Sequence, residues 1–492
     1  MKSDDKNFIK KFAKIFWFKV FLSLLVLTLH IAFFFFLVGQ EMKKNYLLMC
    51  LVALLLSACA DHNSANLFYE EALKNHACDE AFFGEQRKKV DKNDDTIYIG
   101  INAGGLARNC NNFEQSNYFF DKAEEAYKYD VDLQGLATKG TKSVASAVLN
   151  ESVLDYEGTL YERIMVNVYK GLNFMSLKDF ANARVEFNRA LMRQDKAKEY
   201  FAKEIEANRK EFDEAKQDAN YEQNMGNNYN TISARYEHLL KDFATTQDFV
   251  NPYATYMASV FFFLDEDYKR AQDLFKEVAI INKNSAEFNK EFNIFENYAK
   301  SLNPQSLQKY VFVVYESGFG AGLDEFAITL PFTFDGNVVT SSLALPTLKK
   351  RTNSYEYVVA NGSKVADFVD FDNIIATEFK ANMGFRVGKA LSSTIVKTTM
   401  NLAVAKNDPT GGYLSLATSL FNSATTKADL RFWSALPKYA KILALENTGN
   451  IVINSDNGTT LYKNEELPQD KNLLIIVKSH TPKSSVVWLI QR

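Results

Sequence analysis

The chain has 492 residues, of which 47% are hydrophobic, and its formal net charge is −3. This length accommodates two or three domains. A weakly acidic chain without a basic patch interleaved with aromatic residues is not typical of a protein that binds nucleic acid, and we expect no such partner.

The first apolar segment lies within residues 1–41. Lysines at positions 10, 11, 14 and 19 lead into an apolar run over 20–38, which is long enough to span a bilayer. Two interpretations remain open. Residues 1–41 are a spurious extension and translation begins at Met42, or they contain a genuine transmembrane helix.

Residues 42–58 form a second segment that is complete as a secretion signal. Lys43 and Lys44 supply positive charge, a short apolar run covers 46–56, and small residues precede Cys59. The apolar run is shorter than the about 20 residues that a transmembrane helix needs. Two export segments in succession are redundant, so we favour Met42 as the start.

The residues Leu56-Ser57-Ala58-Cys59 resemble the lipobox of bacterial lipoproteins. The resemblance implies that Cys59 is acylated and becomes the N-terminus, and two or three acyl chains anchor a protein stably. Aspartate directly after the lipid-bearing cysteine usually implies retention in the inner membrane. Ala60 holds that position here, which favours the outer membrane, with the body facing the periplasm.

Two cysteines, Cys78 and Cys110, remain in the body of the chain. In an oxidising compartment an even pair is a candidate disulfide, although two free thiols remain an alternative. The histidines stand at no recognised metal-ligand spacing, and we expect neither a metal nor a cofactor.

Residues 59–302 have the composition and apolar spacing of helices. Three segments, 97–130, 164–197 and 252–285, resemble tetratricopeptide repeats, in which small residues let two helices approach closely and aromatic residues pack against the next helix. The residues that carry the resemblance are Gly104, Ser116, Phe120 and Ala123; Gly171, Phe174, Ala183, Phe187 and Ala190; and Ser259, Phe262, Ala271, Phe275 and Val278. An irregular helical bundle is the alternative.

Two features lie between the second and third of these segments. Residues 195–218 carry mixed charge with a thin apolar stripe, which predicts a solvated helix packed on one side. The asparagine-rich residues 220–230 predict a loop, with a protruding helical hairpin as the alternative.

Residues 303–492 change to β-type patterns. Apolar runs bounded by Asp-Gly and Asn-Gly turns predict strands over 310–316, 325–334, 355–360, 442–445, 450–454, 472–479 and 485–491. An apolar stripe over 372–405 predicts one long helix. The fold class is therefore α+β, a helical solenoid of tetratricopeptide-like repeats followed by a β-rich domain.

Two short motifs have competing interpretations. Gly318-x-Gly-x-Gly322 follows a strand but precedes another, whereas a dinucleotide-binding turn requires a helix next, so we favour a flexible inter-strand loop. The stretch from Asp429 through Arg431 and Trp433 to Pro437 is either an exposed interface or a turn fixed by a buried Trp packed under Arg. We favour the buried turn.

Three stretches, 187–201, 316–320 and 429–437, are similar to landmarks of a family of uncharacterised bacterial lipoproteins with tetratricopeptide-like helices and a β-rich C-terminal domain. The resemblance implies no catalytic residues. In some bacteria such proteins look to be encoded near lipoproteins that activate peptidoglycan synthases, and the resemblance thereby implies a role in cell-envelope assembly.

The sequence thus predicts a lipid-anchored scaffold that binds envelope proteins, not an enzyme. The alternatives are a structural part of a secretion, motility or polysaccharide-export machine, and a glycan-processing enzyme with carboxylates that the sequence does not identify. The repeat register places eight apolar residues on the inner wall of a groove that would accept a peptide or helix. They are Met165, Val168, Leu172, Met175, Tyr253, Tyr256, Val260 and Phe263, and they could equally pack against the neighbouring domain.

Overall fold

The computed structural model describes residues 62–127, 156–215, 222–246, 250–334, 336–407, 412 and 427–492. Nearly all of them belong to one compact unit, Asp61–Thr399 with Thr425–Arg492, and the remainder to a second unit, Met1–Ala60 with Met400–Ala424. The predicted extension 1–41, the signal 42–58 and Cys59 lie outside the described residues.

The chain is α+β, with helices in its first part and sheets in its C-terminal part. The helices are α3 (His62–Lys74), α4 (Glu80–Val90), α5 (Thr96–Asn109), α6 (Phe113–Tyr127), α8 (Leu160–Ser176), α9 (Phe180–Ala215), the π-helix η3 (Glu222–Gly226), α11 (Asn227–Leu239), α12 (Pro252–Leu264), α13 (Tyr268–Ile281), α14 (Ala286–Lys300), the 3-10 helix η4 (Pro304–Ser306), α15 (Phe371–Ala381) and α16 (Met383–Lys406).

Each of the three repeat-like segments folds into two packed helices, α5 with α6, α8 with α9, and α12 with α13. Glycine permits the close approach in the first two pairs. A Cβ atom at Gly104 would lie 2.6 Å from the ring of Phe120, and one at Gly171 would lie 2.8 Å from the ring of Phe187. The missing side chain therefore makes room for the aromatic ring of the second helix.

The described strands form three sheets. They are β1 (Tyr310–Ser317), β2 (Gly322–Phe334), β3 (Asn337–Lys349), β4 (Val358–Ala360), β5 (Ser363–Lys364), β6 (Ala366–Asp370), β7 (Tyr439–Glu446), β8 (Ile451–Ser455), β9 (Thr460–Asn464), β10 (Leu473–Ser479) and β11 (Ser485–Gln491). The five-stranded sheet has the order β11-β10-β1-β7-β6, in which β1 and β10 are parallel. The strands β2 and β3 form a long hairpin, and β5-β4-β8-β9 form the third sheet.

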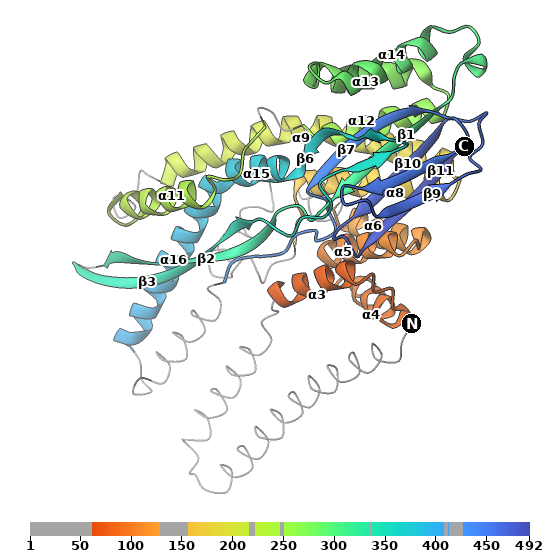
Figure 1. Ribbon diagram of the computed structural model, residues 1–492. Helices are drawn as coiled ribbons and strands as arrows, with labels where there is room; N and C mark the ends of the chain where they lie inside the picture. The colour runs from red at the N-terminus through yellow and green to blue at the C-terminus, as the bar shows by residue number, and fades with distance from the viewer. Residues whose placement is uncertain are drawn as a thin grey trace, which may run out of the picture. The chain divides into compact units, whose positions relative to one another are not determined.

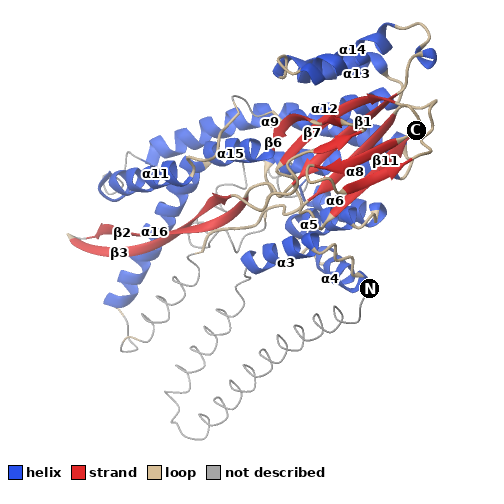
Figure 2. Cartoon of the chain, viewed as in Figure 1, coloured by secondary structure: helices blue, strands red, loops and turns tan. Residues whose placement is uncertain are grey.

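The five-stranded sheet has a different neighbour on each face, because successive residues of a strand point to opposite sides. Phe312 and Val314 of β1 join the large core formed with the helices. Val311 and Val313 join a second core with β4 and β8. Figure 2 shows the helices, in blue, along one side of these strands, in red. The unit therefore has three layers, helices, sheet and sheet.

The predicted boundary between positions 302 and 303 separates helical from β-rich sequence, with η4 following directly. Residues from both sides of this boundary contribute to one large core and to one compact unit. The helices α15 and α16 belong to the β-rich part, which makes that part mixed.

Several details differ from the prediction. The second helix of the 164–197 segment and the charged helix that follows are one helix, α9, of 36 residues. The asparagine-rich stretch is not a loop where it is described, since positions 222–230 lie in η3 and α11. The predicted helix over 372–405 breaks at Asn382 into α15 and α16, and β3, β5, β6 and β9 were not predicted.

Candidate functional site

The eight residues of the predicted groove are all buried. Met165, Val168, Leu172 and Met175 on α8, and Tyr253, Tyr256, Val260 and Phe263 on α12, are each at most 1% exposed. All eight belong to the core that includes residues of the five-stranded sheet. The prediction of a groove open to a partner was therefore wrong, and the alternative, packing against the rest of the chain, is what the structure contains.

Aromatic contacts show what covers this inner face of the helices. The ring of Phe263 lies 5.3 Å from that of Phe312 in β1. Tyr256 lies 5.2 Å from Phe368 in β6, and Tyr253 lies 5.4 Å from Phe371 at the start of α15. The chain fills its own groove, and in this conformation a partner would have to bind elsewhere.

A cluster of ionisable side chains is buried where the helices meet the ends of β1 and β10. Glu316 of β1 and Lys478 of β10 form an ion pair of 3.0 Å. The hydroxyl groups of Tyr169 on α8 and Tyr253 on α12 donate hydrogen bonds to Glu316, and Lys478 donates one to Tyr169. We call these residues, together with Arg108 of α5, the strand-end cluster. Each is at most 3% exposed.

Charge within the strand-end cluster is stabilised in several ways. Burial alone would raise the pKa of Glu316, but attraction to Lys478 and the hydrogen bond from Tyr253 hold that pKa below its usual value. Burial lowers the pKa values of Lys478 and Arg108, although Glu316 opposes the shift in both. The guanidinium of Arg108 lies 4.3 Å from the ring of Trp488, close enough for cation–π attraction.

Arg108 is incompletely paired. One nitrogen donates to Asn173, while Nε and the second terminal nitrogen have no hydrogen-bond partner among the described residues. The cluster thus holds two cations against one carboxylate. Since removal from water is costly for each charge, we interpret this cluster as a stability-sensitive junction between helices and sheet.

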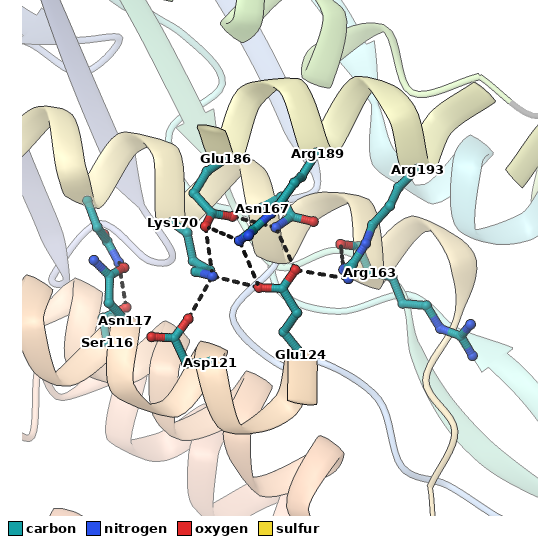
Figure 3. Close-up of polar contacts among 11 residues, drawn as sticks. Ser116, Asn117, Asp121, Glu124, Arg163, Asn167, Lys170, Glu186, Arg189 and Arg193 are labelled. Atoms are coloured by element: carbon teal, nitrogen blue, oxygen red, sulfur yellow. Dashed lines mark hydrogen bonds and ion pairs between the residues drawn. The ribbon is translucent and has the colours of Figure 1, made fainter. Parts of the chain in front are cut away.

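A second ionic network joins α6, α8 and α9 (Figure 3). Lys170 on α8 lies 2.6 Å from Glu124, 3.0 Å from Glu186 and 2.7 Å from Asp121. Burial opposes its charge, but these carboxylates hold the pKa of Lys170 above its usual value. Burial also opposes the charge of Glu124, yet Lys170 and Arg193 lower its pKa to about 2.

A small cavity lies between the start of α8, the helix α15 and residues 429–433. Its volume is about 30 Å³, enough for one or two water molecules. Glu378 is the carboxylate in its lining. Both oxygens of Glu378 accept hydrogen bonds from the backbone N–H groups of Leu160 and Tyr161, at 2.8 and 3.2 Å.

Burial raises the pKa of Glu378 to about 7, although the two backbone N–H donors oppose the shift. A raised carboxyl pKa beside a cavity is typical of an active site. Here the same carboxyl caps the first turn of α8, so its environment already has a structural explanation.

The stretch that contains Arg431 and Trp433 is buried, as the sequence indicated. Arg431 lies 2.9 Å from Asp95 and 2.8 Å from Asp429. The Trp433 ring packs edge-on against Phe120 and Tyr169, with centroids 5.4 and 5.5 Å away. This stretch therefore joins the first two helix pairs to the start of β7.

The glycine motif at 318–322 connects β1 to β2, as expected, but it is buried and closely packed, which the expectation of a flexible loop did not include. Gly318 has a φ of 69°, a conformation that side chains disfavour. A Cβ atom at Gly320 would lie 2.8 Å from the backbone oxygen of Pro437, and one at Gly322 would lie 2.8 Å from the ring of Phe432. These glycines permit close backbone packing.

Cys78 and Cys110 form a disulfide in the structure. It ties the segment before α4 to the end of α5. Within the described residues, no group of three or more His, Cys, Asp or Glu side chains could hold a metal ion. No described helix combines the length and the apolar character needed to cross a membrane.

Exposed apolar side chains remain available for contact with other molecules. On α9, Val185 and Met192 are 43% and 57% exposed, two turns apart on one face. On α3, Leu67 and Phe68 are 54% and 50% exposed. No local pattern in the sequence distinguishes these positions, because solvent-facing and core-facing apolar residues look alike until the neighbouring elements are placed.

Comparison with protein-family models, curated proteins and solved structures finds no match to this chain.

Proposed function

We propose that this protein is a lipoprotein, anchored through acylated Cys59, that serves as a protein-binding scaffold in the cell envelope. The observation that carries the proposal is the position of the lipobox-like sequence. Leu56–Cys59 ends only three residues before α3 begins at His62, so a folded body follows the lipidation site almost directly.

The disulfide supports export, since such bonds persist in oxidising compartments outside the cytoplasm. Ala60 in place of aspartate favours the outer membrane, with the body in the periplasm. The three helix pairs, with Gly104 against Phe120 and Gly171 against Phe187, support classification as tetratricopeptide-like repeats, which commonly bind proteins.

The binding surface that we propose is the outer face of α9 around Val185 and Met192, because the inner faces of α8 and α12 are covered. Val185 and Met192 expose apolar area of the kind that a protein partner buries. The partner is an envelope protein, in keeping with the family that the sequence resembles.

The first test is fractionation and in-cell crosslinking of the full chain beside the Cys59→Ala variant. We expect the wild type to sediment with the outer membrane and to crosslink to envelope proteins. Cys59→Ala should be soluble and capture far less. If Cys59→Ala stays in the membrane, residues 20–38 act as the anchor and lipidation is not the mechanism.

The second test separates anchoring from protein binding. A Val185→Glu/Met192→Glu variant should remain in the membrane but lose its crosslinked partners. Lys198→Glu, an exposed change on the same helix, is the matched control and should retain them. Unchanged crosslinking in the double variant would exclude this face as the binding surface.

A further inference from the structure

The first helix of the folded body carries an unusual pair of exposed apolar side chains. Leu67 and Phe68 are adjacent on α3 and are each half exposed. The Phe68 ring contacts that of half-buried Phe82 on α4, with centroids 4.9 Å apart. We call Leu67, Phe68 and Phe82 the α3–α4 apolar surface. Figure 1 shows α3 and α4, in orange-red, below α5.

Chain length places this surface close to the proposed anchor. From Cys59 to His62 a fully extended chain spans at most about 11 Å. From His62 to Leu67 the helix rises about 7.5 Å. The Cα atom of Leu67 therefore lies within about 19 Å of that of the acylated cysteine, which itself sits at the bilayer surface.

The opposite face of α3 holds the helix on the body. Tyr69, Ala72 and Leu73 are buried, and Asn66 donates a hydrogen bond to the backbone oxygen of Leu430 at 2.6 Å. With this face of α3 packed on the body, Leu67 and Phe68 remain on its solvent-exposed face.

The charge nearest the pair is partly neutralised by an ion pair. Glu71, between Leu67 and Phe68 around the helix, forms an ion pair of 3.0 Å with Lys74, and Glu70 lies 2.8 Å from the same lysine. Exposed Arg87, Lys88 and Lys89 end α4 and suit the headgroups of anionic phospholipids.

We propose that the α3–α4 apolar surface inserts into the headgroup region of the membrane and so fixes the orientation of the body relative to the bilayer. Apolar side chains of interfacial helices enter this region to a depth of about 5–10 Å. The inference rests on the proposed lipid anchor at Cys59, and it adds a second contact that acyl chains alone do not supply.

The test uses Phe68→Trp in the lipidated full chain, reconstituted into vesicles of phosphatidylethanolamine and phosphatidylglycerol with or without brominated acyl chains. We expect the fluorescence of the introduced indole to shift to the blue and to be quenched by the brominated lipid. The signal of the parent chain is subtracted. Trp433 and Trp488 are buried, and the third tryptophan, Trp17, is absent from a chain cleaved before Cys59.

The matched control is Ile280→Trp, an apolar position on α13 that is 63% exposed and far along the chain from the anchor. It should show no quenching. Circular dichroism and urea unfolding of both variants establish that they fold like the parent chain.

Three outcomes are distinguishable. Quenching at position 68 but not at 280 supports membrane insertion. A vesicle-bound, lipidated chain whose position 68 is unquenched overturns the insertion while the anchor stands, and leaves a protein as the occupant of the surface. A chain that carries no lipid by mass and does not float with vesicles overturns the anchor and, with it, this inference.

Discussion

Glu316 and Lys478 are direct neighbours in the register of the parallel strands β1 and β10, and their side chains form an ion pair on the helix-facing side of the sheet. They are far apart in the sequence, on strands at opposite ends of the β-rich part. Arg108 adds a second cation to the same buried region, so the two members of the pair are not equivalent.

This asymmetry predicts unequal effects of mutation. Glu316→Gln leaves Lys478 and Arg108 buried without a carboxylate and should lower the free energy of unfolding by about 3–5 kcal/mol. Lys478→Met should cost less, because Arg108 and two tyrosine hydroxyls still stabilise Glu316. Urea unfolding at pH 7 measures both, and an equal or larger loss for Lys478→Met would contradict the two-cation interpretation.

Two helical glycines should respond in opposite directions to alanine. A Cβ atom at Gly105 of α5 would lie 2.7 Å from both Ala435 and the Trp433 indole nitrogen. Gly105→Ala should therefore destabilise by about 1–3 kcal/mol through overpacking. At Gly84 of α4 no atom lies within 4 Å of the added Cβ, and Gly84→Ala should stabilise by about 0.5–1 kcal/mol. Thermal unfolding of the two single variants gives the comparison.

The disulfide should contribute measurably to stability. Cys78 and Cys110 are 32 positions apart, and closing such a loop in the unfolded chain is worth about 3–4 kcal/mol in the chain-entropy model. Cys78→Ser/Cys110→Ser should lower the unfolding free energy by that order. Dithiothreitol should destabilise the wild type toward the variant and leave the variant unchanged. A wild type insensitive to full reduction would show that the bond adds little.

The raised pKa of Glu378 predicts that the stability of the fold depends on pH. Its folded-state pKa is about 7, above the ordinary glutamate value near 4.5, so the folded protein holds this proton more tightly than the unfolded chain does. The associated stability is present below about pH 4.5 and is lost as the pH rises through about 7, a change of about 3 kcal/mol.

The Glu378→Gln variant has no ionisable side chain at this position. The unfolding free energy of the wild type, taken relative to this variant, should therefore fall between pH 4.5 and 7 and stay level above that range. Asp372→Asn is a control, because burial also raises the pKa of Asp372, to about 6, and its loss should remove a separate part of the pH dependence. Parallel curves for the wild type and Glu378→Gln would contradict the assignment.

Local patterns were sufficient for much of the secondary structure. The continuous apolar runs of β1, β10 and β11 identify strands. The first two are buried on both faces, whereas buried and half-buried positions alternate along β11. Most aromatic residues of the helix pairs lie in the interior, since Phe120, Phe187 and Phe275 are fully buried, whereas Phe174 is half-buried.

Other features depend on tertiary contacts that no local pattern reveals. The asparagine-rich segment is helical because its side chains bind the β2–β3 hairpin. Asn224 donates to the backbone oxygen of Thr333 and Asn228 to that of Pro331. Such contacts override the usual preference of asparagine for turns. The covered inner faces of α8 and α12 are a similar case, since the repeat register identifies the apolar wall but not what packs on it.

The position of the covering strands in the chain has a consequence for biogenesis. Tyr169 contacts Lys478 across 309 positions, and Asn66 contacts Leu430 across 364. During synthesis from the N-terminus, the helices emerge before the strands that complete their core. The inner face of α12 lacks its cover until β1, β6 and α15 arrive. The inner face of α8 lacks its contacts with β10 and β11 for longer still, and uncovered apolar surface of this kind favours aggregation. Maturation of this protein should therefore depend on holding chaperones, and truncation before β10 should direct the product to proteolysis.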